Sequence, residues 1–97
     1  MTLPIELHPE AIEEGAEARR WYAERDVGAA LGFVSALDDA IARIADSPLR
    51  WPQYLHDTRR LLTRRYPFAV VYRVFDDRVL VVAIAHQRRR PGYWAIR

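Results

Sequence analysis

Apolar and polar residues alternate at the start of the chain and then change to a helical spacing. Residues 3–7 read Leu-Pro-Ile-Glu-Leu, the period of a strand with one buried face. Pro9 stands at the position typical of the first residue of a helix, and the spacing predicts a helix from Pro9 to about Glu24. We expect the core-facing stripe of this helix to be Ile12, Gly15, Ala16, Arg19 and Tyr22, flanked by Ala11, Ala18 and Trp21.

A second helical pattern follows almost at once. Asp26 is a good N-cap for a helix from Val27 to about Ala45, and Pro48 then prevents its continuation. The link between the two helices is short, which predicts an antiparallel helical hairpin. The apolar stripe expected to face the core is Val27, Ala30, Leu31, Val34, Leu37, Ile41 and Ile44.

Two nearly continuous apolar runs, at residues 68–75 and 79–85, dominate the second half of the chain. They are rich in Val, Ile, Tyr and Phe and are separated by Asp-Asp-Arg, which predicts a β-hairpin in the middle of a sheet. Residues 58–65 have the pattern of one more strand. The resulting order, β-α-α-β-β-β, predicts a single α+β domain over residues 1–97, with the helical hairpin packed on a mostly antiparallel sheet.

Composition narrows the class of protein further. Ninety-seven residues suffice for one core, and the absence of cysteine excludes disulfides and thiolate metal sites. The longest uncharged run, residues 27–37, falls short of the roughly 20 residues needed to span a bilayer. Residues 1–8 lack the pattern of a signal peptide. We therefore expect a cytoplasmic protein that needs no cofactor and does not bind a membrane.

The modest net charge of +2 conceals a strong asymmetry. Residues 1–57 carry five arginines and eleven acids, a net charge of −6, whereas residues 58–97 carry ten arginines and two acids, a net charge of +8. A basic half of this kind indicates an anionic partner, either nucleic acid or an acidic protein segment.

Arginines bracket the two apolar runs and form the candidate binding set. Arginine suits bidentate contacts with phosphate or carboxylate groups. The alternative interpretation is a solvated basic rim without a partner. The arginines concerned are Arg59, Arg60, Arg64, Arg65, Arg88, Arg89 and Arg90.

His86, Tyr93 and Trp94 are the other candidates for chemistry. His86 is the imidazole of the basic region, and RNA cleavage by 2′-hydroxyl attack needs a group that accepts or donates a proton near neutral pH. The alternative is a strand-end histidine that bonds a neighbouring backbone carbonyl. Tyr93 and Trp94 could stack on a base or a peptide, or could pin the C-terminal segment to the core. His8 and His56 have no metal-ligand spacing, so we interpret both as structural.

Taken together, these segments resemble the RelE/ParE superfamily of bacterial toxins, and more narrowly its ParE-like plasmid-stabilisation branch. The resemblance rests on residues 64–73, 79–86 and 89–94, and on the Pro-Glu-Ala, Trp-Tyr and Ser-Pro motifs before them. It implies a small toxin of a type II toxin–antitoxin system that is neutralised by a cognate antitoxin encoded beside it. It also implies the β-α-α-β-β-β fold derived above.

The two branches of this superfamily differ in their targets, and the resemblance bears on the choice. RelE-like members cleave messenger RNA in the ribosome, whereas ParE-like members inhibit DNA gyrase. The cleaving branch has an arginine immediately before the Val-Val-Tyr of the central strand, where this chain has Ala69. In the preceding strand, Leu62 stands where a cation would be, and only Arg60 and Arg64 match the basic pattern.

Two residues of the cleaving pattern nevertheless have counterparts. Arg89 matches a basic position after the last strand, and His86 could match an acid–base position of some cleaving relatives. A set without its central cation would lose much of its electrostatic catalysis. The resemblance therefore implies a growth-inhibiting gyrase binder first. The alternatives are a ribosome-dependent endoribonuclease using His86, Arg89 and possibly Tyr93, and a degenerate member that binds antitoxin without toxicity.

Overall fold

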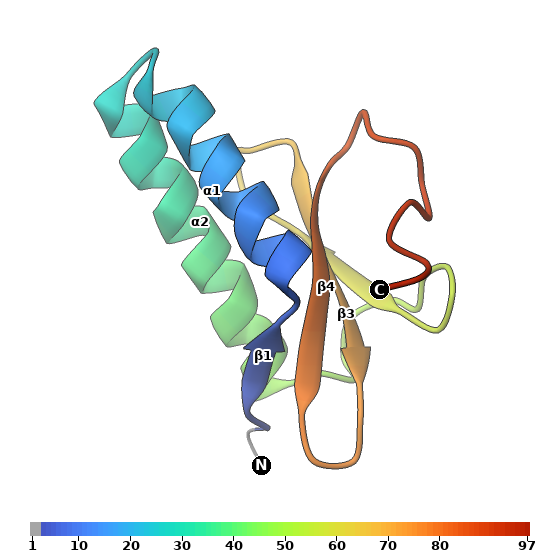
Figure 1. Ribbon diagram of the computed structural model, residues 1–97. Coiled ribbons are helices and arrows are strands. Elements are labelled where there is room, and N and C mark those ends of the chain that lie inside the picture. The colour runs from blue at the N-terminus through green and yellow to red at the C-terminus, as the bar shows by residue number, and fades with distance from the viewer. Residues whose placement is uncertain (1–2) are drawn as a thin grey trace.

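The helices and strands follow one another in the predicted order. The structure is a computed structural model that describes residues 3–97. Figure 1 shows two helices lying over a twisted sheet, and the α+β class is confirmed. The elements are β1 (Ile5–Leu7), α1 (Pro9–Ala23), α2 (Val27–Asp46), β2 (Arg59–Leu62), β3 (Phe68–Val74) and β4 (Val79–His86).

The sheet is mixed and mostly antiparallel, as expected. Its strand order is β1-β4-β3-β2, with β1 parallel to β4 and the other neighbours antiparallel. The central strand β3 pairs Phe68 with His86 of β4 and Ala69 with Leu62 of β2. The end of β2, the start of β3 and the end of β4 therefore lie at one end of the sheet.

Each face of the sheet is covered by a different part of the chain. The helical hairpin covers one face, where Phe33, Ile44, Phe68 and Tyr72 belong to the larger core cluster. The C-terminal segment covers the other face, where Trp94 packs on a smaller cluster from β3 and β4. Strands buried on both faces explain why their sequences are almost wholly apolar.

Side chains cap both helices at their N-termini. His8 Nδ1 accepts the backbone N–H of Glu10 at 3.1 Å, which gives His8 the structural role expected of it. Asp26 accepts the N–H of Gly28 at 2.8 Å, as its position predicted. These bonds satisfy donors that a helix start otherwise leaves unpaired.

The predicted core-facing stripes are wrong in part. On α1, Ile12 and Arg19 are exposed, and the buried residues are Ala11 and Ala18, one position earlier in each case. Alanine lets α1 approach the sheet and α2 closely, and this contact sets the face that is buried. Tyr22, on the predicted stripe, does pack against the core.

On α2 the error concerns mainly the first two turns. Val27 and Leu31 are each 66% exposed, whereas Phe33 and Ala40 are buried. Figure 1 shows the helices diverging from β4 toward their connecting loop, so apolar residues near this tip have no sheet beneath them. Apolar spacing alone could not distinguish the two faces.

Candidate functional site

A groove lies between α1 and the end of the sheet where β3 starts and β4 ends. We call it the α1 groove; its volume is about 520 Å³. Its lining combines aromatic, acidic and basic side chains: Glu14, Glu17, Ala18, Trp21, Tyr22, Pro67, Phe68, Ile84, His86 and Arg89.

Aromatic rings form the base of the α1 groove. Tyr22 lies 5.5 Å from Phe33 and 5.1 Å from Tyr66, centroid to centroid, and Phe33 lies 5.1 Å from Phe68. Interlocking rings of this kind hold one another in fixed orientations. Trp21 stays 52% exposed at the margin. The groove thus offers a rigid apolar surface to a partner.

Glu14 is the centre of a hydrogen-bond network that the sequence did not reveal. Its side chain is only 11% exposed. It accepts the backbone N–H of Ile84 at 3.0 Å and the Tyr93 hydroxyl at 2.7 Å. Arg97 donates to both of its carboxylate oxygens, at 2.9 and 3.1 Å, and Arg89 lies 3.4 Å away. A single carboxylate therefore fastens the C-terminal segment to α1 and β4.

The strand β1 is shorter than β4, and beyond its end side chains contact β4. Tyr72 pairs with Val81 but Val71 pairs with Ala83, so Val82 is an extra residue in β4. Such a bulge leaves a backbone group without a ladder partner. The Arg97 guanidinium donates to the Val82 carbonyl at 3.0 Å.

Arg97 is held as a cation by the acids of α1. Burial alone would lower the pKa of Arg97, but its hydrogen bonds to Glu14 and the nearby charges of Glu14 and Glu10 raise it overall. The Arg97 Nε atom lies 3.0 Å from Glu10 Oε2.

Tyr93 is held in its neutral form. Burial, followed by the hydrogen bond to Glu14, raises the pKa of Tyr93 well above the usual range of a phenol. Arg89 lies over the Tyr93 ring, with its guanidinium carbon 3.8 Å from the centroid. The hydroxyl cannot serve as a base near neutral pH while it donates to Glu14.

His86 closes one end of the α1 groove. Its ring packs edge-on against Phe68, with centroids 5.1 Å apart, and its Nδ1 accepts the backbone N–H of Arg88 at 3.0 Å. The structural alternative for His86 predicted a bond to a backbone carbonyl; the bond is to a backbone N–H instead. With Nδ1 used as the acceptor, the neutral ring carries its proton on Nε2.

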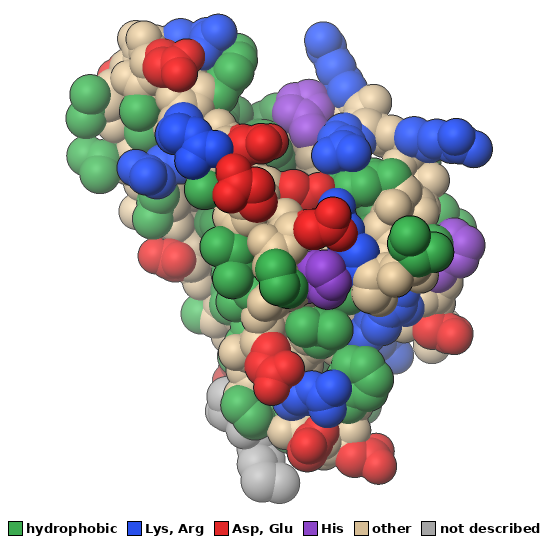
Figure 2. All heavy atoms as spheres, viewed as in Figure 1, with side chains coloured by type: hydrophobic (Ala, Val, Ile, Leu, Met, Phe, Trp, Pro, Cys, Tyr) green, Lys and Arg blue, Asp and Glu red, His purple; other side chains and the backbone are tan. Residues whose placement is uncertain are grey.

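The candidate arginines do not form one cluster. Five of them are exposed and lie at the end of the sheet that carries the α1 groove. They lie at the same end because β3 pairs there with both β2 and β4, and because the Gln87 N–H bonds the Pro67 carbonyl at 2.8 Å. We call this set the arginine rim; Figure 2 shows arginines standing above the acidic side chains of the neighbouring surface. It consists of Arg64, Arg65, Arg88, Arg89 and Arg90.

The two remaining arginines of the predicted set have other surroundings. Arg59 donates to the carbonyls of Leu49 at 3.1 Å and Trp51 at 2.7 Å, so it fastens the loop before β2. Arg60 lies over the ring of Tyr54 at 4.1 Å. Neither belongs to the arginine rim.

Trp94 is buried, which corrects its place among the candidate binding residues. Its side chain is 2% exposed and its ring stacks on Tyr54 at 5.5 Å. It could contact a partner only by leaving the core. The alternative, in which Trp94 pins the C-terminal segment to the sheet, agrees with this packing.

Known toxins resemble this chain in sequence and in fold. Residues 5–91 match the family model described as the ParE toxin of the type II toxin–antitoxin system parDE. The chain belongs to this ParE toxin family. A solved structure described as "Chromosomal ParDE TA system from P. aeruginosa" matches with a TM-score of 0.75 and 17% identity, covering 88% of this chain and 96% of that one. An identity this low supports the fold alone. No curated protein gave a significant match.

The α1 groove of this ParE-family chain has mixed charge. Glu14 and Glu17 line it beside His86 and Arg89. Carboxylates so close to a reacting phosphate would repel it and offset the attraction of the single arginine. The groove is better suited to apolar side chains with a basic edge than to a phosphodiester.

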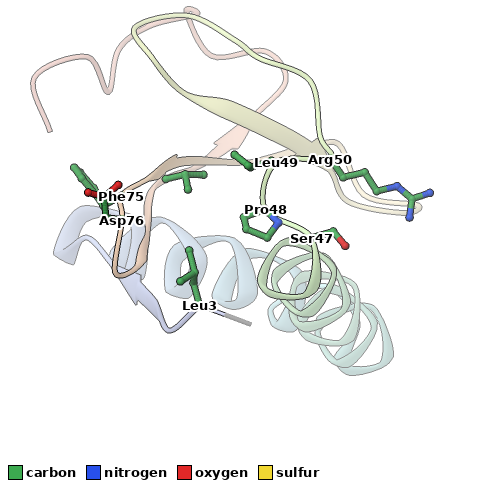
Figure 3. A pocket seen from close by; sticks show the side chains of 8 residues that line it. Leu3, Ser47, Pro48, Leu49, Arg50, Phe75 and Asp76 are labelled. Atoms are coloured by element: carbon green, nitrogen blue, oxygen red, sulfur yellow. The ribbon is translucent and has the colours of Figure 1, made fainter. Parts of the chain in front are cut away.

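A second hollow of about 570 Å³ lies at the other end of the sheet, beside the β3–β4 turn. Figure 3 shows that Leu3 of the N-terminal segment and Pro48 and Leu49 of the loop after α2 approach it, near Phe75 and Asp76. Its lining is mainly apolar and contains none of the candidate site residues.

Residues 3–97 contain neither a metal-binding cluster nor a helix suited to a membrane. No group of three or more His, Cys, Asp or Glu side chains in that part of the chain is placed to hold a metal ion. Neither α1 nor α2 is both long and apolar enough to cross a bilayer.

Proposed function

We propose that this ParE-family toxin arrests growth by binding DNA gyrase rather than by cleaving RNA. We further propose that a cognate antitoxin neutralises it by inserting apolar side chains into the α1 groove. One observation carries the choice between binding and cleavage. The side chains that would perform cleavage take part in bonds within the protein.

Each of the three candidate catalytic residues illustrates this. His86 uses Nδ1 to accept the Arg88 N–H. The Tyr93 hydroxyl donates a hydrogen bond to Glu14, and its pKa is raised. Arg89 donates to Glu14 and lies over the ring of Tyr93, so the Glu14 carboxylate partly neutralises its charge within the groove. The set is organised to hold the C-terminal segment.

The central strand adds a second argument. By resemblance, cleaving relatives carry an arginine where this chain has Ala69. Ala69 is buried in the cluster beneath Trp94, so the missing cation has no substitute at that place. Transition-state charge on a phosphate would lack its central stabilising group.

The surface around the α1 groove supports the binding interpretation. The aromatic base and the exposed Trp21 provide apolar contacts, and aromatic anchors in grooves dominate the energetics of many interfaces. The arginine rim lies beside them and would attract an acidic antitoxin from a distance. The similar solved structure is that of a toxin–antitoxin system.

Endoribonuclease activity is the second candidate, because the structure does bring two of its residues together. His86 and Arg89 line the same groove, and the His86 Nε2 atom is not used by the Arg88 contact. A chain that binds antitoxin without toxicity is the third.

The test is to induce the toxin alone in cells and determine which process stops first. We expect trapped gyrase–DNA complexes and a DNA-damage response, with messenger RNA intact. His86→Ala should arrest growth as the wild type does, whereas Arg88→Glu with Arg90→Glu should arrest it less. Cleaved messenger RNA, lost with His86→Ala in a folded protein, would overturn the proposal in favour of the endoribonuclease. A chain that arrests nothing would support the third candidate.

A further inference from the structure

A second charged groove runs along the outer edge of β2, which is the edge of the sheet opposite β1. We call it the β2-edge groove; its volume is about 460 Å³. It contains three arginines and no acidic side chain in its lining, which consists of Arg43, Pro52, Gln53, Tyr54, Arg60, Leu61, Leu62 and Arg64.

The backbone of β2 presents unpaired groups to this groove. Thr63 donates its N–H to Phe68 of β3, and backbone groups alternate in direction along a strand, so those of Arg60 and Leu62 point away from β3. The preceding loop uses part of this edge, because Arg60 donates its N–H to the Pro52 carbonyl at 3.2 Å. Among residues 3–97, no backbone partner is found for the outward N–H and carbonyl of Leu62.

Two of the three arginines beside this edge have no carboxylate partner. Arg43 has a carboxylate partner, Asp39, at 3.6 Å. Within residues 3–97, Arg60 and Arg64 have no carboxylate within 4.0 Å. The Arg60 guanidinium is held over Tyr54 at 4.1 Å, which limits the freedom it would lose on binding an anion.

The aromatic rings next to the groove are not free to stack on nucleic-acid bases. Tyr54 lies between Arg60 on one side and Trp94, at 5.5 Å, on the other. Trp51 has the guanidinium groups of Arg43 and Arg50 at 4.8 and 5.1 Å from its centroid. Binding of single-stranded nucleic acid normally depends on exposed rings. The observations therefore favour a polypeptide over an oligonucleotide.

We propose that the β2-edge groove binds an acidic, extended polypeptide segment of a partner protein, which adds a strand to the sheet at β2. The backbone of the segment would pair with the Leu62 N–H and carbonyl, and its carboxylates would contact Arg60 and Arg64. Its apolar side chains would rest on Leu62, which is 47% exposed. The α1 groove has no part in this contact, and Arg64 is the one residue of the β2-edge groove that also belongs to the arginine rim, so the inference does not depend on the gyrase proposal.

The first experiment uses a fluorescein-labelled peptide of about ten residues with alternating Glu and Val, a length typical of strands. Fluorescence anisotropy would measure its binding to the full chain, next to the same peptide with Lys in place of Glu and an oligo(dT) of equal length. We expect binding of the Glu peptide only, weakening as salt is raised. Amide exchange at Leu62 should slow when the peptide binds. Binding by the Lys peptide or tighter binding by oligo(dT) would overturn the proposal, as would bound Glu peptide without protection of Leu62.

Two kinds of variant separate the contributions of charge and backbone. Arg60→Glu with Arg64→Glu should lower the affinity for the Glu peptide at least about tenfold, which corresponds to about 1.4 kcal/mol. The control, Arg88→Glu with Arg90→Glu, changes the net charge equally outside the groove and should leave most of the affinity. Equal losses in both pairs would show that only the overall charge matters, and would overturn the proposal.

Leu62→Pro tests the backbone. Its N–H points outward, so proline removes the donor to the incoming strand without removing a bond to β3, and proline is tolerated on edge strands. A folded Leu62→Pro protein should lose binding of the Glu peptide, while Leu62→Ala should retain most of it. Unchanged affinity in a folded Leu62→Pro protein would contradict strand addition, and the arginine pair provides the test if that variant does not fold.

Discussion

At the scale of single residues, Glu14 and Arg97 explain how the C-terminal segment is held. Nothing in the sequence distinguishes Glu14 from the other acids of α1, and Arg97 lies 83 residues away in the chain. Only the fold brings them together, at the place where β1 ends and β4 has an extra residue. Patterns of apolar residues carry no signal for such a pair. His86 and Tyr93 could be selected from the sequence, but their bonding partners could not.

Replacing Glu14 by Gln should destabilise the protein by about 2 kcal/mol, because it removes the charge that accepts hydrogen bonds from the Arg97 guanidinium, which is 10% exposed, and leaves Glu10 as its remaining carboxylate partner. Urea denaturation would measure the change. Glu13→Gln is the matched control: Glu13 pairs with Arg20 on the surface, and such pairs contribute less than about 1 kcal/mol. Equal losses in the two variants would contradict the central role of Glu14.

Tyr72 should make the stability depend on alkaline pH. Burial raises the pKa of Tyr72 to about 12, although the nearby charge of Arg59 acts to lower it. In the unfolded chain the pKa of the tyrosine hydroxyl is about 10. The folded state thus favours the neutral phenol. Its contribution to stability is complete below pH of about 10 and is lost as the pH rises toward 12.

Tyr72→Phe tests this dependence. The variant should be less stable at pH 7 by about 1 kcal/mol, because the 2.6 Å bond to the Pro48 carbonyl is lost. It should then lose less stability than the wild type between pH 9 and about 11.5. Urea midpoints across this range would measure both effects. Parallel pH profiles would show that Tyr72 does not titrate differently in the folded state.

At the scale of elements, the apolar runs predicted the strands better than the apolar stripes predicted the helix faces. Residues 68–75 and 79–85 are nearly continuous apolar runs, and β3 and β4 are buried on both faces. The position of these strands could therefore be predicted without deciding which face is buried. On α2 the face had to be chosen among residues spread around the helix. The diverging hairpin tip leaves Leu31 exposed, which depends on tertiary geometry that the sequence does not express.

The buried face of α2 can be tested by truncation. Ile44 is fully buried in the core, so Ile44→Ala should destabilise the protein by about 2–5 kcal/mol. Leu31→Ala removes the same class of side chain from an exposed position and should change stability by less than about 0.5 kcal/mol. Similar shifts of the denaturation midpoint would mean that the helix is rotated relative to this description.

At the scale of the whole molecule, the acidic first half and the basic second half partly neutralise each other. Glu10 and Glu14 of α1 pair with Arg97, and Glu14 also lies near Arg89. The sequence predicted an excess of positive charge for a partner. Within residues 3–97, four of the five arginines of the arginine rim and Arg60 of the β2-edge groove have no carboxylate within 4.0 Å. The net charge of each half therefore indicated the sign of the partner but not its place.

The arginine rim should accelerate association with an acidic antitoxin. Changing Arg88, Arg89 and Arg90 to Glu should slow the association rate at low salt, with a smaller effect on dissociation, because rim charges act mainly on encounter. Stopped-flow kinetics would measure the rates. Near 1 M salt, where the Debye length is about 3 Å, the association rates of the variant and the wild type should become similar. An unchanged rate at low salt would remove the rim from the antitoxin interface.

The most direct test of the central claim is a supercoiling assay with purified DNA gyrase and purified toxin. We expect the wild type and His86→Ala to inhibit supercoiling at concentrations that agree within about threefold, since a proton-transfer residue would contribute about 10²-fold or more. Both proteins should leave messenger RNA intact on translating ribosomes. Gyrase that stays fully active with the wild-type toxin, together with ribosomal cleavage that disappears in His86→Ala, would contradict the account.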